Sequence, residues 1–144
     1  MPKLKSPNRK PSRIRKLIPN RRRHMLHETF DVNEKELMRK LDELFSHVWM
    51  VRTFLKHCEE AEEDDELCDV HRTLYDCMHA LGPAVSDGNA TAYLKQARKK
   101  LRKLREATEL FSEIQPEISS HTNFQMAEQS LRTSVTEISS LLET

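Results

Sequence analysis

The chain has 144 residues, which suits one domain with one hydrophobic core. It contains only two glycines, which argues against the Rossmann and phosphate-loop architectures, because their turns need several. No apolar run approaches the roughly 18 residues of a membrane-spanning helix, and no secretory cleavage pattern opens the chain. The three cysteines, an odd number, indicate reduced thiols. These features predict a cytoplasmic protein that has no contact with the membrane.

The net charge of +1 hides a strong asymmetry. The first 27 residues carry ten Lys and Arg and no acid, so the remaining 14 basic residues face all 23 acids, a net charge of −9. Four prolines interrupt this basic segment, and residues 1–30 are therefore predicted to be a disordered tail. Its cations either neutralise phosphates of RNA or DNA, or only keep the chain in solution. The residues expected to carry binding are Arg13, Arg15, Lys16, Arg21, Arg22 and Arg23.

A first amphipathic helix is predicted to begin near Asp31 or Asn33 and to continue to Cys58. Its apolar residues alternate between four- and three-residue steps, the spacing of one buried seam, and Phe45 and Trp49 widen that seam. An acidic run over residues 59–66 follows and is predicted to be a solvated turn. The seam consists of Leu37, Leu41, Leu44, Val48, Val51, Leu55 and Cys58.

Three further segments repeat this spacing. The second extends from Leu67 to Leu81 and is predicted to end at Gly82-Pro83. The third, from Tyr93 to Phe111, has Ser86, Asp87 or Asn89 as candidate N-caps, and Gln115-Pro116 is predicted to open the fourth. No strand pattern is present. The predicted fold is therefore an all-α, antiparallel up-and-down four-helix bundle over residues 31–144.

The third helical segment has a strongly basic outer face, with seven cations among the eleven residues 95–105. This face either contacts phosphates or pairs with the acidic turn of the same chain. Its candidate binding residues are Arg98, Lys99, Arg102 and Lys103.

The fourth segment, in contrast, has a polar but almost uncharged outer face, which favours a homodimer contact through that helix. The residues of that face are Ser130, Thr133, Ser134, Thr136, Ser139 and Ser140.

Histidines and cysteines of the first two helices suggest an alternative chemistry. If the acidic turn joins these helices antiparallel, facing residue numbers add to about 125. Two thiols and two imidazoles then lie together and suit tetrahedral zinc, while two more histidines lie near carboxylates, as in di-iron bundles. The candidate zinc or iron ligands are His47, His57, Cys58, Cys68, His71 and His79.

The spacing of Arg52 and His57, like that of Arg72 and His79, resembles the minimal Arg–His motif of helical HEPN-type ribonucleases. The resemblance covers two residues at each place, so no site is carried over from it. No nucleophile with the surroundings needed for catalysis is found in the sequence.

The sequence thus predicts a non-enzymatic interaction module without a cofactor, whose basic tail and third helix bind nucleic acid or an acidic protein. A metal-binding bundle and an oligomeric scaffold with an inert tail are the alternatives.

Overall fold

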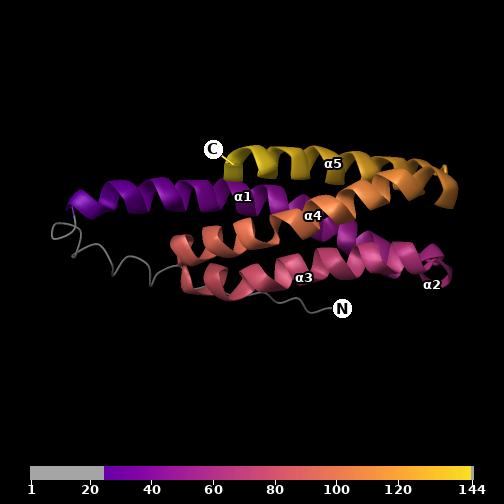
Figure 1. The fold of residues 1–144 in the computed structure, drawn as a ribbon, viewed down its shortest axis with the longest axis horizontal. Helices are drawn as coiled ribbons and strands as arrows, with labels where there is room; N and C mark the ends of the chain where they lie inside the picture. The colour runs from indigo at the N-terminus through magenta and orange to yellow at the C-terminus, as the bar shows by residue number, and fades with distance from the viewer. Residues whose placement is uncertain (1–24, 144) are drawn as a thin grey trace. The chain divides into compact units, whose positions relative to one another are not determined.

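The computed structural model describes the backbone of residues 25–143 and the side-chain surroundings of residues 32–143. This part of the chain is helical and contains no strand, as predicted (Figure 1). The helices are α1 (Met25–His57), α2 (Glu60–Glu63), α3 (Asp65–Asp87), α4 (Ala90–Ile118) and α5 (Thr122–Glu143). None of these described helices has the length and apolar character required to cross a membrane.

The chain divides into two units, residues 1–33 and residues 34–144. In the first unit the structure describes the helical backbone of residues 25–33, which opens α1, and the exposed side chains of Val32 and Asn33. The predicted start of this helix near Asp31 or Asn33 is wrong, because α1 begins at Met25. Residues 25–30 contain neither proline nor glycine, and extending a helix is easier than nucleating one, so a potential cap does not stop it. The six candidate cations of the tail, Arg13 to Arg23, lie outside the described residues.

The second helical segment does not end at Gly82-Pro83, as predicted, but continues through both residues to Asp87. A proline inside a helix removes one N–H donor, and its ring restricts the preceding residue through that residue's Cβ, which Gly82 lacks. The helix ends at Gly88, whose φ of 64° is left-handed. There the N–H groups of Gly88 and Asn89 bond to the carbonyl oxygens of Val85 (3.1 Å) and Ala84 (2.9 Å).

Gln115-Pro116 likewise does not open the fourth helical segment. Pro116 lies in the last turn of α4, which continues to Ile118, and α5 starts only at Thr122. So close to the helix end a proline removes a single hydrogen bond, and the Gln115 side-chain amide donates to the Ser119 carbonyl oxygen at 2.9 Å.

The acidic connection is more ordered than a solvated turn. It contains the short helix α2, whose Ala61 is buried, and Asp64 then caps α3 by accepting the Leu67 N–H at 2.9 Å. Asn89 caps α4 in the same way through the Ala92 N–H at 3.0 Å, which confirms one of the three predicted caps.

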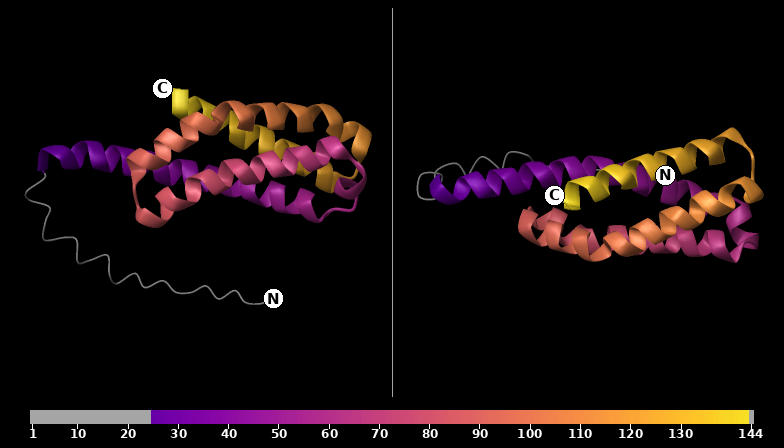
Figure 2. Two further views of the ribbon diagram at one scale, coloured as in Figure 1. Left: turned by 60° about the horizontal axis from the view of Figure 1, so that its bottom comes forward. Right: turned by 45° about the horizontal axis from the view of Figure 1, so that its top comes forward.

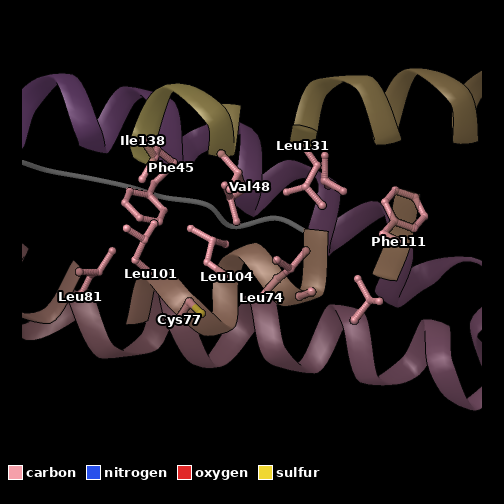
Figure 3. Close-up of a cluster of buried hydrophobic side chains, with 14 of the residues drawn as sticks. Phe45, Val48, Leu74, Cys77, Leu81, Leu101, Leu104, Phe111, Leu131 and Ile138 are labelled. Carbon is pink, nitrogen blue, oxygen red and sulfur yellow. The ribbon is translucent and has the colours of Figure 1, made fainter. Parts of the chain in front are cut away.

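The core of the second unit contains side chains of all four long helices (Figure 3). Most predicted seam positions are fully buried, while Leu37, Leu44 and Cys58 pack against the core from its edge. Trp49 does not widen the buried seam, because it is 39% exposed. Figure 3 shows α1 contributing Phe45 and Val48, α3 Leu74 and Cys77, α4 Leu101 and Leu104, and α5 Leu131 and Ile138.

Neighbouring helices meet along their lengths. α3 lies beside α4, and α4 lies beside α5 (Figures 1 and 2). Aromatic rings connect α1 with each of the others: Phe45 meets Tyr93 of α4, Phe54 meets Phe124 of α5, and Trp49 meets Tyr75 of α3, at centroid distances of 6.4, 5.0 and 6.2 Å. The rings therefore hold α1 against three elements at once.

Candidate nucleic-acid interface

The outer face of the first half of α4 is a continuous cationic surface. Leu94, Ala97, Leu101 and Leu104 turn the other side of the helix into the core, which leaves the intervening cations outside. All four predicted binding residues of this helix are exposed. Together with Lys95 they form what is called here the α4 cationic face: Lys95, Arg98, Lys99, Arg102 and Lys103.

Few acids oppose this face. Arg102 pairs with Glu106 one turn on at 3.2 Å, but the two side chains are 87% and 62% exposed, so the pair contributes little. Arg98 donates through Nε to the carbonyl oxygen of Leu142 at 3.3 Å. In the described part of the chain, Lys95, Lys99 and Lys103 form no ion pair. Most of the positive charge is thus left facing solvent.

The acidic turn does not lie against the α4 cationic face. The Cys77 thiol reaches the Lys100 carbonyl oxygen of α4 at 3.9 Å, while Asp69 lines a shallow groove with Lys103. Residue numbers therefore fall along α3 as they rise along α4, which places the start of α3 beyond Lys103, toward the end of α4. This register does not support the alternative in which the α4 cationic face pairs with the acidic turn.

The candidate metal ligands are dispersed. No three His, Cys, Asp or Glu residues in the described ranges lie where they could hold one ion. Cys58 donates its thiol proton to the Leu55 carbonyl oxygen at 3.1 Å, and burial raises its pKa. His57 donates through Nδ1 to the Thr53 carbonyl oxygen at 2.9 Å. Cys68 is a half-buried free thiol.

The other three histidines have separate surroundings. Burial lowers the pKa of His71, and the positive charge of Arg52 adds to this effect. His79 stacks on Tyr75 with ring centroids 5.7 Å apart, and His47 lines a groove between α1 and α5.

Sequence reasoning missed a cluster in which Arg52 of α1 lies against two aromatic rings. Its guanidinium carbon is 4.7 Å from the ring centroid of Trp49 and 4.7 Å from that of Tyr75. Both rings are 39% exposed, and His79 extends the stack on α3. The sequence held a signal for it, because the numbers of Trp49 and Tyr75 add to 124, close to the sum of about 125 expected for facing residues if the two helices are antiparallel.

The predicted neutral face of the last helix is partly an inner face. Ser134 is buried and Ser139 is half-buried, because this helix also packs against its neighbours. Ser130 and Thr133 line a groove of ≈ 520 Å³ with Leu44 and His47 of α1. Met126, which is 52% exposed, borders the same groove.

No protein-family model, no curated protein and no solved structure matches this chain.

Proposed function

We propose that the protein is a non-enzymatic helical bundle that binds the phosphate backbone of nucleic acid through the α4 cationic face and its basic N-terminal tail. The observation that carries the proposal is a row of five exposed cations on α4, four of which form no ion pair in the described part of the chain. Cations left unpaired on a rigid surface favour a polyanion, because binding releases the counterions of the phosphates.

The spacing of these cations supports a linear ligand. Lys95, Lys99 and Arg102 follow one another at about one helical turn, or about 5.4 Å, along a single side of α4. Arg98 and Arg102 can each present two parallel donors to a phosphate. Ten more cations lie in residues 1–27 of the same chain, and they increase the charge available to one strand.

The scaffold in this proposal is an up-and-down antiparallel bundle of α1, α3, α4 and α5. The cross-helix contacts support it, since Trp49 meets Tyr75 near the middle of α3, and Phe54, near the end of α1, meets Phe124 at the start of α5. The three cysteines are free thiols, which fits the reducing conditions of the cytoplasm, the location we propose.

A salt series with matched charge variants tests the proposal. Binding of the full chain to labelled RNA and DNA is measured from low to physiological salt. Lys99→Gln/Lys103→Gln is expected to weaken binding and to lower the salt slope by about two, one for each lost phosphate contact. Lys35→Gln/Lys40→Gln removes the same charge from exposed positions of α1 and is expected to leave binding near the wild-type level.

A tail variant completes the test. Arg21→Gln/Arg22→Gln/Arg23→Gln is expected to lower the slope by about three. Equal losses of affinity in the two double-lysine variants would contradict the assignment of the binding surface to α4. Binding to polyglutamate with none to nucleic acid would overturn the proposal in favour of an acidic protein partner.

We further propose that the α1–α5 face forms a homodimer. Met50 and Met126, 63% and 52% exposed, line adjoining grooves between the two helices, so the surface of α5, on which Glu137 is the one acid lining these grooves among the described residues, continues into an apolar one. Exposed apolar side chains within a surface of low charge are typical of a subunit contact.

A further inference from the structure

The α1–α3 face has a second feature that the α4 cationic face does not explain, an arginine that lies against two aromatic rings. We propose that Trp49, Arg52 and Tyr75 bind one nucleotide unit of a single strand, with the phosphate at the Arg52 guanidinium and the unpaired base on an exposed ring. This inference rests on the proposed nucleic-acid function and names the form of nucleic acid that the protein takes.

The Arg52 guanidinium has ring contacts but no acceptor of its own in the described part of the chain. Its guanidinium lies 4.7 Å from both ring centroids, so aromatic carbon replaces water beside it. Its Nε is buried and has no acceptor, and no carboxylate pairs with it in the described part of the chain. The terminal N–H groups of Arg52 are then left as a fork of donors for an anion with two oxygens.

The charge around the fork also bears on the ligand. Lys56 lies one turn beyond Arg52 on α1, and Arg72 comes from α3. The positive charges of Arg52, Arg72 and Lys56 all disfavour protonation of His71, which indicates that they gather around one place. The fork therefore has a positive surrounding that suits a phosphate.

The pair of rings then selects among anions. A carboxylate of an acidic peptide would satisfy Arg52 and leave both rings in water. A nucleotide carries a flat π surface beside its phosphate, and base–aromatic stacking stabilises a bound single strand. In a duplex the bases are already stacked and paired, so their faces cannot reach Trp49 or Tyr75. The combination of fork and rings therefore fits an unpaired nucleotide.

The experiment uses Trp49 as its own reporter, because it is the only tryptophan in the chain. The full-length protein is titrated with labelled oligothymidylate of about 12 nucleotides, and with a duplex of the same length, at low salt. Label anisotropy follows binding, and tryptophan fluorescence follows stacking. We expect oligothymidylate to quench Trp49 in step with binding, and the duplex to bind without quenching.

Three variants locate the contact. Arg52→Lys keeps the charge but removes the fork, and it is expected to weaken oligothymidylate binding about tenfold. Tyr75→Leu is expected to weaken single-strand binding while duplex binding stays unchanged. Arg39→Gln is the matched control, since Arg39 also lies on α1 but pairs with Glu36 and Glu43, and it should bind like the wild type. Far-UV circular dichroism checks that each variant is folded.

The outcomes separate the two proposals. Saturating anisotropy without a change in Trp49 fluorescence overturns the inference and leaves the proposed function standing. Wild-type affinity in both Arg52→Lys and Tyr75→Leu overturns it as well. No anisotropy change with either oligonucleotide overturns the proposed function itself.

Discussion

Cys77 shows how burial changes the chemistry of one side chain. It is 1% exposed between α3 and α4, and burial raises the pKa of its thiol to about 11, from a usual 9.0. Since only the thiolate reacts with alkylating agents, the thiolate fraction at mildly alkaline pH falls about a hundredfold.

We therefore predict that iodoacetamide modifies Cys68 in the folded protein long before Cys77. Peptide mass spectrometry after a time course at pH ~8 gives the two rates, and in urea all three cysteines should react alike. Similar rates for Cys68 and Cys77 without urea would show that α3 and α4 separate readily.

The Glu128 carboxylate of α5 accepts hydrogen bonds from its own helix and from α4. It accepts from Arg132 Nε at 2.9 Å and from the Ser112 hydroxyl of α4 at 2.6 Å, and the Arg132 bond followed by the Ser112 bond lowers its pKa. A carboxyl whose pKa is lower in the folded state stabilises the fold above its unfolded pKa. That contribution is lost as the pH falls below about 4.5 and through the lower pKa that Glu128 has in the folded protein.

Glu128→Gln should accordingly lower the free energy of unfolding by about 1 kcal/mol at neutral pH, with little difference from the wild type at pH ~3. Urea unfolding across this range measures the gap. Glu106→Gln, at an exposed pair, serves as the control and should differ little from the wild type at any pH. If the difference in the free energy of unfolding between Glu128→Gln and the wild type stays constant with pH, a charge effect is excluded.

At the scale of elements, the two glycines provide a matched pair on α3. Apart from its chain neighbours, a Cβ at either position would meet nothing within 4 Å, so backbone conformation and the proline after Gly82 distinguish the two positions. Gly82 lies inside the helix, where alanine restricts the unfolded chain, whereas Gly88 has a φ of 64°, a conformation that strains other residues.

Gly82→Ala is expected to stabilise the protein by less than about 0.5 kcal/mol, because the restriction that Pro83 places on a preceding Cβ offsets part of the gain, and Gly88→Ala is expected to destabilise it by about 1 kcal/mol. Thermal and urea unfolding of the two variants would measure both signs. A destabilised Gly82→Ala would mean that Pro83 tolerates no Cβ before it, because that atom is the one a proline ring restricts.

The apolar spacing predicted which faces of the elements are buried, and it did so because burial follows a 3.6-residue period. Leu41, Leu74, Leu104 and Leu131 are four examples, one from each long helix. Helix ends were predicted less well at Pro83 and Pro116, since each helix continues past its proline to residues that pack on the core, Ala84 and Ile118.

The binding surfaces depend on contacts between helices, which spacing alone does not define. The cations of α4 were predicted as a face, because they lie on one helix. The Arg52 cluster needed α1 and α3 in register before Tyr75 could be placed beside Trp49. Sequence patterns therefore find sites within one helix more readily than sites between two.

At the scale of the whole molecule, the proposed homodimer predicts where one added charge has the largest effect. Met126→Glu would bury a carboxylate against the α1–α5 face of the second copy, where nothing compensates the loss of its hydration. Val85→Glu adds the same charge at another exposed apolar residue, near the end of α3, and serves as the control. Sedimentation velocity at micromolar concentrations should show a dimer for the wild type and for Val85→Glu, and a monomer for Met126→Glu. A monomeric wild type at every concentration would overturn the dimer, and equal dissociation by the two variants would show that net charge, rather than this face, controls assembly.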